Sequence, residues 1–286
     1  MAKVFVINLD RCNGCYNCQL ACKDEHVDND WTPYAKPQPD TGHFWMRMVE
    51  MERGSIPKVR VTYIPTPCMH CDAAPCIPAC PVKAIYKRSD GLVIIDPTRC
   101  NGCRACIDAC PYGAIYFNGA LGIAQKCTGC AHIVDGKADI PPEYPLTVPR
   151  CVDSCPTEAI RFGEYEELRD LISRAEVLHP EYGTQPRVYY IGLPKPFIAG
   201  EVYDPEADEV IEGAAVTAVD LSSGATFSTT TDEFGDFWLK NLEWNKVYQL
   251  TIVKEGYYPT VLGAVSTTRD TNLGPIPLNK KTYTKK

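Results

Sequence analysis

The sequence predicts an α+β protein of two parts: a cysteine-rich domain that contains a duplicated unit, followed by an all-β sandwich domain. Three observations support this prediction. All sixteen cysteines lie in the first 155 residues. Two similar segments, beginning at Val6 and Val93, each lead into a group of cysteines. From Phe197 onward the pattern changes to short runs typical of β-strands, separated by turn residues.

The cysteines occur in four groups of four. In the first and third groups, three cysteines are spaced by two residues and a fourth follows after three more, the run that binds a [4Fe-4S] cubane in bacterial ferredoxins. One tight loop can supply three thiolates to a cubane, so the fourth must come from elsewhere in the chain. Sixteen thiolates therefore divide into four [4Fe-4S] clusters with none left over. The groups are Cys12, Cys15, Cys18 and Cys22; Cys68, Cys71, Cys76 and Cys80; Cys100, Cys103, Cys106 and Cys110; and Cys127, Cys130, Cys151 and Cys155.

Three other uses of sixteen cysteines fit this pattern less well. Disulfide scaffolds belong to small secreted chains, whereas this N-terminus has no apolar signal region, so we expect a cytoplasmic protein. Structural zinc sites usually join two separated Cys-x-x-Cys pairs, whereas here three cysteines fall within seven residues twice over. The regular repetition argues against scattered redox thiols.

The repetition extends beyond the cysteines. Residues 6–15 and 93–103 each contain a short β-rich run, an acidic turn and an Asn-Gly bend into the cysteine loop. The last cysteine of the second, third and fourth groups is followed by proline, which ends the local turn. An Ala-Ile pair comes three residues after each of these prolines. We expect these pairs to shield the clusters from water and to lead into the next strand.

Charge and hydropathy exclude several classes of function. The formal net charge is −7, and no basic tract suggests binding to nucleic acid or to an anionic membrane. No stretch approaches the roughly 18 to 20 apolar residues that a membrane-spanning helix needs. We therefore expect no direct membrane span.

We expect three segments along the chain. They are a four-cluster ferredoxin-type domain over 1–163 with a hairpin insertion at about 27–66, a helix and extended linker over 164–196, and an immunoglobulin-like β-sandwich over 197–286. Within the insertion, residues 43–52 and 58–64 alternate as two strands. Apolar residues at helical spacing predict one amphipathic helix over about 164–177. An extended stretch over 183–190 follows it.

The tail contains six short β runs, and its turn signals include Ser223-Gly224 and Glu255-Gly256. The segments from Thr231 and Tyr248 resemble carboxypeptidase-regulatory or collagen-adhesin B-type immunoglobulin-like modules. The tail has no concentration of His, Cys or paired carboxylates, so we expect a binding or stabilising role. The expected strands are about 197–203, 214–219, 225–230, 235–239, 247–254 and 257–265.

The cysteine region resembles the four-cluster iron–sulfur subunits of the dimethyl sulfoxide reductase superfamily of molybdopterin enzymes. The resemblance rests on the Cys-Asn-Gly-Cys start at Cys12, on Pro-Cys-Met-His-Cys from Pro67, and on Gln-Lys-Cys-Thr-Gly-Cys from Gln125. The tail and the segment Gly183-Thr-Gln-Pro-Arg-Val-Tyr-Tyr190 are most similar to the small subunits of pyrogallol–phloroglucinol transhydroxylases and relatives such as resorcinol hydroxylase. The fold implied is a duplicated ferredoxin-like cluster-binding domain followed by the immunoglobulin-like sandwich.

The family pattern also implies how the ligands are shared and which partner binds. The partner is a large catalytic subunit that carries molybdenum and two pterin guanine dinucleotides, in a heterodimer or a multiple of it. No residue of this chain is then catalytic. The implied sets are Cys12, Cys15, Cys18 and Cys155 for cluster 1; Cys68, Cys71, Cys76 and Cys110 for cluster 2; Cys80, Cys100, Cys103 and Cys106 for cluster 3; and Cys22, Cys127, Cys130 and Cys151 for cluster 4.

The main functional hypothesis is an electron-transfer subunit that relays electrons between the partner's molybdopterin and an external donor or acceptor. Two alternatives are a free polyferredoxin-like carrier or hydrogenase-type subunit, and a zinc-binding interaction scaffold. His70, inside the second cysteine group, could tune a cluster through a hydrogen bond to sulfur or could be a satisfied surface side chain. The sequence leaves both roles open.

Overall fold

The computed structural model describes residues 2–138 and 145–281. The chain divides into two compact units. Unit 1 comprises Met1–Glu50 and Thr62–Leu193, and unit 2 comprises Met51–Val61 and Pro194–Lys286. Unit 2 therefore includes a short piece of chain that lies within the cysteine-rich region of the sequence. Within the described ranges, every helix falls short of the length and apolar character that crossing a bilayer requires.

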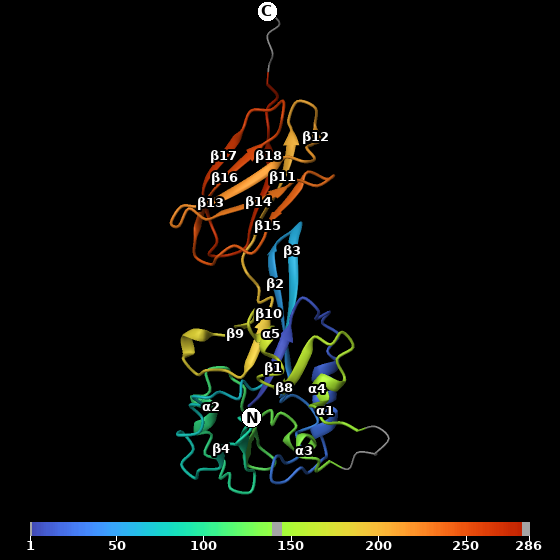
Figure 1. Ribbon diagram of the computed structural model, residues 1–286, viewed down its shortest axis with the longest axis vertical. Coiled ribbons are helices and arrows are strands. Elements are labelled where there is room, and N and C mark those ends of the chain that lie inside the picture. The colour runs from blue at the N-terminus through green and yellow to red at the C-terminus, as the bar shows by residue number, and fades with distance from the viewer. Residues whose placement is uncertain (1, 139–144, 282–286) are drawn as a thin grey trace, which may run out of the picture. The chain divides into compact units, whose positions relative to one another are not determined.

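A four-stranded sheet runs through unit 1 (Figure 1). Its strands are β1 (Lys3–Asn8), β8 (Ile160–Glu164), β9 (Glu176–Val177) and β10 (Val188–Ile191). The order is β8-β1-β10-β9, with β1 parallel to β10 and the other pairs antiparallel. The alternating side chains of β1 pack against two separate clusters of apolar residues, because Phe5 and Ile7 lie in the main core of the unit and Val4 and Val6 face the other side.

Short elements surround the cysteine loops. Two small hairpins are formed by β4 (Ile85–Lys87) with β5 (Val93–Ile95) and by β6 (Tyr116–Asn118) with β7 (Ile123–Gln125). Four helices carry or follow cysteines: α1 (Asn17–His26), α2 (Ala105–Ala109), α3 (Ala131–Val134) and α4 (Arg150–Asp153). Two of the three Ala-Ile pairs pack as predicted, since Ala84, Ile85, Ala159 and Ile160 are all buried and precede or begin β4 and β8. In the third pair, Ile115 is buried and Ala114 is half-buried.

The two Asn-Gly bends have the same local structure, which supports the predicted duplication. The side-chain oxygen of Asn13 accepts a hydrogen bond from the N–H of Cys15 at 3.3 Å, and Asn101 accepts the equivalent bond from Cys103 at 3.3 Å. Each bend is followed by a residue in the left-handed region that begins a helix. These residues are Tyr16, with φ 62°, before α1 and Arg104, with φ 64°, before α2.

Glycine is required in both bends. Gly14 has φ 70° and Gly102 has φ 72°, where residues with a Cβ are strained. A Cβ at Gly14 would lie 2.5 Å from the Tyr63 ring, and one at Gly102 would overlap the carbonyl oxygen of Gly122. The Asn-Gly signal therefore reflects both backbone conformation and close packing.

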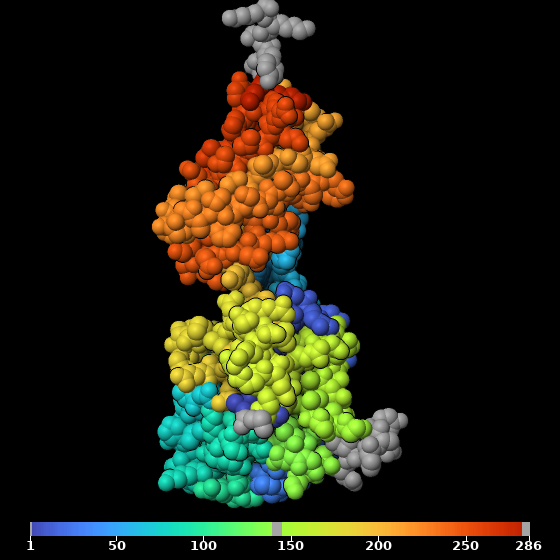
Figure 2. Space-filling view, viewed as in Figure 1, coloured from blue at the N-terminus to red at the C-terminus, as the bar shows by residue number. Residues whose placement is uncertain are grey.

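The segment after β8 differs from the single helix expected over 164–177. Strand β8 continues to Glu164, the helix α5 covers only Arg169–Ile172, and β9 then pairs with β10. The apolar spacing identified the correct buried face, because Leu168, Leu171 and Ile172 pack against Val4 and Val6. Pairing of Glu176 and Val177 with β10 ends the helix early. Figure 2 shows this yellow-green segment on the surface of unit 1.

The extended stretch predicted over 183–190 is confirmed only in its second half, because Gly183 and Gln185 have φ 63° and 53°, in the left-handed region. It is also no free linker. Its second half enters β10, which lies between β1 and β9 in the sheet. Val188 and Tyr190 are fully buried, and the Tyr190 hydroxyl donates a hydrogen bond to the carbonyl of Pro65 at 2.9 Å. The segment up to Leu193 therefore belongs to unit 1.

Unit 2 is a β-sandwich of two sheets (Figure 1). Its core is a cluster of buried apolar residues that includes Val202, Phe237, Tyr248 and Leu250. One sheet has the order β12-β11-β15 with β18 also paired to β11, and the other has the order β14-β13-β16-β17. The strands are β11 (Ile198–Asp204), β12 (Glu209–Val210), β13 (Ala215–Asp220), β14 (Thr226–Thr230), β15 (Asp236–Leu239), β16 (Val247–Val253), β17 (Thr260–Ser266) and β18 (Thr271–Pro277). The six predicted strands are confirmed, and β12 and β18 are additional.

The two strands predicted within the insertion pair as a hairpin, which extends into unit 2. Its strands are β2 (Arg47–Ser55) and β3 (Lys58–Thr66), and the tip between Met51 and Val61 belongs to unit 2. In unit 2, Arg53 forms a salt bridge with Asp270 at 3.3 Å, with both side chains less than a tenth exposed. Lys58 forms a second ion pair with Asp236.

Candidate functional site

All sixteen cysteines lie in the described residues, and none forms a disulfide. Their thiols gather into four sets, each of which takes members from two of the cysteine groups of the sequence. These sets are set 1 (Cys12, Cys15, Cys18, Cys155), set 2 (Cys68, Cys71, Cys76, Cys110), set 3 (Cys80, Cys100, Cys103, Cys106) and set 4 (Cys22, Cys127, Cys130, Cys151). This grouping agrees with the four ligand sets that the family resemblance implies.

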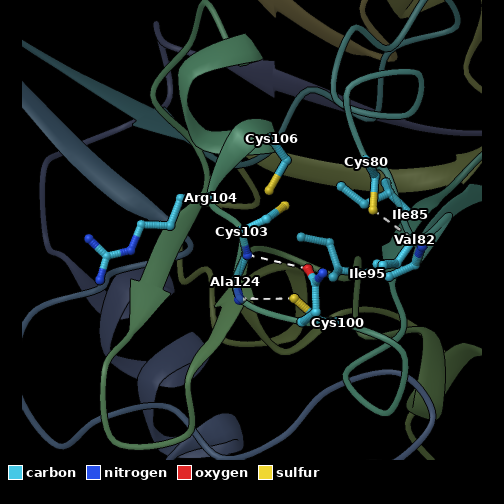
Figure 3. Close-up of a pocket in the computed structure, with 11 residues that line it drawn as sticks. Cys80, Val82, Ile85, Ile95, Cys100, Cys103, Arg104, Cys106 and Ala124 are labelled. Atoms are coloured by element: carbon cyan, nitrogen blue, oxygen red, sulfur yellow. Dashed lines mark hydrogen bonds between the residues drawn. The ribbon is translucent and has the colours of Figure 1, made fainter.

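Set 3 lines one cavity, whose empty space is about 280 Å³ (Figure 3). The four sulfur atoms point into the same space, from the loop before β4 and from the loop and helix around α2. Val82, Ile85 and Ile95 form apolar walls. The side chain of Arg104 points away from the sulfur atoms, and its guanidinium lies over the Phe117 ring at 3.8 Å from the centroid.

Set 2 lines a second cavity, with about 340 Å³ of empty space. Met69, Val93 and Ile115 contribute apolar surface, and Lys126 also lines it. Burial raises the pKa of the Cys76 thiol to about 12. A thiol in this state does not ionise at neutral pH unless a strongly electropositive group is bound beside it.

Sets 1 and 4 are defined by the electrostatic interactions among their thiols. Cys18 interacts with Cys12, Cys155 and Cys15, and burial raises its pKa to about 12. In set 4 all four cysteines are buried, and burial raises the pKa of the Cys22 and Cys151 thiols well above its usual range. In the sequence, twenty residues separate Cys130 from Cys151. The structure brings these two thiols together.

The sets adjoin one another in a definite order. Thiols of set 1 and set 4 interact through Cys18, which neighbours both Cys22 and Cys151. Set 4 meets set 2 where Cys127 neighbours Cys68. Sets 2 and 3 both border β5, since Val93 lines the cavity of set 2 and Ile95 lines that of set 3. The order is therefore set 1, set 4, set 2, set 3, and the exposed cysteines Cys15 and Cys103 belong to the two terminal sets.

Backbone N–H groups donate hydrogen bonds to several of the sulfur atoms. The N–H of Ala84 donates to Cys80 Sγ at 3.3 Å, and the N–H of Ala159 donates to Cys155 Sγ at 3.2 Å. Both alanines belong to the repeated Ala-Ile pairs, for which the sequence indicated only apolar packing. Burial tends to raise the pKa of the Cys155 thiol, but hydrogen bonds from its neighbours outweigh this effect and lower it. Such bonds stabilise negative charge on sulfur.

A [4Fe-4S] cubane fits these residues by the chemistry of the donors, since each set brings together four thiols that line one cavity or interact electrostatically. Within residues 2–138 and 145–281, no three His, Cys, Asp or Glu side chains converge as ligands of a single metal ion would. The thiols of sets 2 and 3 instead border a cavity. A bound cluster supplies one-electron transfer, while the surrounding protein sets its potential through burial, charge and hydrogen bonds to sulfur.

His70 is buried, so the interpretation of it as a surface side chain is wrong. Its Nδ1 accepts a hydrogen bond from the N–H of Val93 at 3.0 Å, which leaves the proton on Nε2. That N–H has no partner among the described residues. His70 is absent from the residues that line the set 2 cavity.

Two other histidines lie beside set 4. The Nδ1 atom of His26 lies 2.9 Å from the carbonyl oxygen of Cys22. Burial lowers the pKa of His26 to about 4. The His132 Nε2 lies 2.9 Å from a carboxylate oxygen of Glu25, and its ring stacks on Trp31. These rings form part of the dense packing that separates set 4 from water.

Comparison with known protein families identifies both units. A 4Fe-4S dicluster domain matches residues 59–165, and a 4Fe-4S binding domain matches residues 9–29. A carboxypeptidase regulatory-like domain matches residues 198–274. Among solved structures, the shaft pilin SpaA of Lactobacillus rhamnosus GG matches 35% of this chain and 54% of its own, with 14% identity and a TM-score of 0.27.

Curated relatives match over much longer stretches. The pyrogallol hydroxytransferase small subunit of Pelobacter acidigallici is 37% identical over 90% of this chain and 93% of its own length. A putative dimethyl sulfoxide reductase iron–sulfur subunit of Halobacterium salinarum is 34% identical over 65% of this chain and 77% of its own. A tetrathionate reductase subunit of Salmonella typhimurium is 33% identical over 68% of this chain and 73% of its own.

The names of these relatives refer to several different enzymes, and two of the family models that match this chain are 4Fe-4S domains. The chain belongs to the family of iron–sulfur subunits of molybdopterin oxidoreductases in the dimethyl sulfoxide reductase superfamily, in which it is a non-catalytic electron-transfer subunit.

Proposed function

We propose that this chain carries four [4Fe-4S] clusters, held by sets 1 to 4, and relays electrons to or from a large molybdopterin subunit that acts on hydroxylated aromatic compounds. The observation that carries this proposal is the exchange of thiols between groups. Cys80 lies with the thiols of the third cysteine group, and Cys110 lies with those of the second. This exchange is expected of paired ferredoxin motifs.

The order of the sets supports a linear path for electrons. Set 4, in which all four cysteines are buried, and set 2, in which three are buried, would lie between sets 1 and 3, each of which has one exposed cysteine. Electrons would therefore enter at one terminal cluster and leave at the other. One terminus would face the molybdopterin of the large subunit, and the other would face an external redox partner.

The partner and its substrate class follow from the family. The large subunit would supply the molybdenum with two pterin guanine dinucleotides in a heterodimer or a multiple of it, since the cysteine sets of this chain suit iron clusters. A relative that matches this chain over nearly its whole length is named for pyrogallol, a hydroxylated aromatic. Sixteen cysteines without a disulfide also suit a reducing compartment, which supports location in the cytoplasm.

Anaerobic purification of the native complex tests this function. Iron and acid-labile sulfide are measured per chain, and the co-purifying subunit is analysed for molybdenum. About sixteen irons per chain are expected from four cubanes. About half that content with all cysteines intact would contradict the four-cluster proposal, and a free chain without a molybdenum partner would favour a polyferredoxin-like carrier. Turnover of pyrogallol, compared with dimethyl sulfoxide and tetrathionate, tests the substrate class.

A further inference from the structure

We propose that Lys126 is a shared counter-charge for the clusters of set 2 and set 4, and that it raises the reduction potentials of both. The inference rests on the proposed ligand sets. Lys126 directly precedes Cys127 in the Gln-Lys-Cys-Thr-Gly-Cys motif. Three features of its environment carry the argument.

The first feature is an isolated buried charge. Lys126 is 2% exposed, and its ammonium group donates hydrogen bonds to the carbonyl oxygens of Val93 and Cys127. In the described part of the chain these bonds go to neutral groups, and no carboxylate forms a salt bridge with this lysine. Burying an ammonium group without a counter-charge is costly. A negatively charged group bound nearby would remove that cost.

The second feature is the position of Lys126 between two thiol sets. It lines the cavity bordered by Cys68, Cys76 and the other thiols of set 2. The carbonyl that it contacts at 3.0 Å belongs to Cys127 of set 4. Although burial raises the pKa of the Cys76 and Cys127 thiols, the charge of Lys126 acts on both in the opposite direction. One ammonium group therefore acts electrostatically on two neighbouring sets.

The third feature is the contrast with Lys87, which also lies beside set 2. Its Nζ is 3.4 Å from the carbonyl oxygen of Cys71, but it forms an ion pair with Asp72, which also binds Arg187 at 2.6 Å. This group is partly exposed, so neighbouring charge and solvent compensate it. Lys126 is neither compensated nor screened in this way.

The consequence for redox chemistry follows from charge. A [4Fe-4S] cluster with four thiolates is negative, and reduction adds one further negative charge. A buried positive charge stabilises the reduced form more than the oxidised form, which raises the potential. Because Lys126 adjoins both sets, it would raise both potentials together.

The experiment compares Lys126→Gln, Lys126→Arg and Lys87→Met in the intact complex with its large subunit. Redox titration followed by electron paramagnetic resonance gives the midpoint potentials, and iron is measured per chain. In Lys126→Gln, two of the four potentials should become more negative and the other two should stay unchanged. Lys126→Arg should retain the original potentials, and Lys87→Met should cause a smaller shift than Lys126→Gln.

Each other outcome has a defined meaning. Intact clusters with unshifted potentials in Lys126→Gln would overturn the proposal, as would a shift of one potential alone. If Lys126→Gln loses iron, the Lys126→Arg variant distinguishes the two explanations. Full iron and original potentials in Lys126→Arg would support the role of the positive charge. Loss of iron in Lys126→Arg as well would show that Lys126 is needed for packing, and would overturn the proposal. A wild-type complex that lacks one of the two central clusters would instead contradict the proposed ligand sets.

Discussion

At the scale of single residues, Cys80 tests whether the second and third cysteine groups exchange ligands. It borders the cavity of set 3, whose other thiols are Cys100, Cys103 and Cys106, and it accepts a hydrogen bond from the N–H of Ala84. We expect Cys80→Ser to damage the cluster of set 3 and to leave that of set 2 in place. Electron paramagnetic resonance and iron analysis would measure the loss, with Cys76→Ser as the matched control for set 2. Loss of the set 2 signal in Cys80→Ser would contradict the exchange of ligands.

A second prediction at this scale concerns Asp204, at the end of β11. Its carboxylate is 3.1 Å from the Tyr257 hydroxyl and 2.7 Å from Lys280 Nζ, and the Lys280 ammonium group lowers its pKa to about 2. We therefore expect Asp204→Asn to lower the melting temperature of unit 2, while the exposed Asp208→Asn has little effect.

The pH dependence of this effect follows from the sign of the shift. A carboxyl with a lowered pKa in the folded state stabilises the fold above its unfolded pKa of about 3.9, and the contribution is lost as pH falls toward 2. Calorimetry at pH 5 and pH 7 should thus give the same destabilisation for Asp204→Asn. An effect at pH 7 that is absent at pH 5 would show that another group is responsible.

Cysteine spacing was sufficient to predict the kind of cofactor, and the family resemblance implied sets that agree with the grouping of thiols in the structure. The role of those thiols as iron ligands stays a prediction. The isolation of Lys126 and the burial of His70 could not be predicted, because both depend on the backbone of Val93, which is distant in sequence. Burial is a property of the assembled fold, and spacing within one loop does not report it.

At the scale of elements, the hairpin of β2 and β3 provides the clearest test. The side chain of Arg53 is less than a tenth exposed and lies beside Asp270, which also accepts a hydrogen bond from the N–H of Phe197 at 3.0 Å. Removing one partner of a buried ion pair leaves an uncompensated charge and costs about 3–5 kcal/mol. We expect Arg53→Met to destabilise unit 2 by about this amount, as measured by denaturant unfolding followed by tryptophan fluorescence.

The double variant Arg53→Met with Asp270→Leu is the control, because it removes both charges. It should be more stable than Arg53→Met alone. If the two variants are equally unstable, the hairpin tip is held by apolar contacts, such as that of Gly54 with Phe197, rather than by the ion pair.

Elements were predicted well where the pattern was long and regular, as in β11, β13 and β16. Strand β18 was missed because Gly274, Pro275 and Pro277 interrupt it, and such residues normally argue against a strand. It forms because it pairs with β11 in parallel across a register shift between Ala199 and Glu201, where the ladder is irregular. The sequence pattern of one segment does not show that a partner strand can pair with it despite its glycine and prolines.

At the scale of the whole molecule, the division into two units predicts the effect of truncation. Deleting 197–286 should leave the clusters in place, since every cysteine belongs to unit 1. It should reduce binding to the large subunit, for which an immunoglobulin-like module without catalytic groups would supply surface. The deletion also removes the ion-pair partners of the hairpin tip, because Arg53 loses Asp270 and Lys58 loses Asp236.

The matched variant for this experiment combines the deletion with a hairpin shortened by replacing 52–60 with an Asn-Gly turn. Iron content and affinity for the large subunit are measured anaerobically for both. We expect full iron in the shortened form and poorer yield in the simple deletion. Loss of iron from both forms would show that the two units fold as one.

The division of β2 and β3 between the units also fixes the order of events during synthesis on the ribosome. Arg53 emerges long before the carbonyl of Lys195 that it binds, which lies 142 residues further along the chain. All sixteen cysteines leave the ribosome before the last strands of the sandwich are made. The cluster-binding unit can therefore receive its iron on a nascent chain, whereas the hairpin tip stays exposed until translation is nearly complete. A stalled or prematurely terminated chain would display that tip without the partners that it has in the complete unit 2.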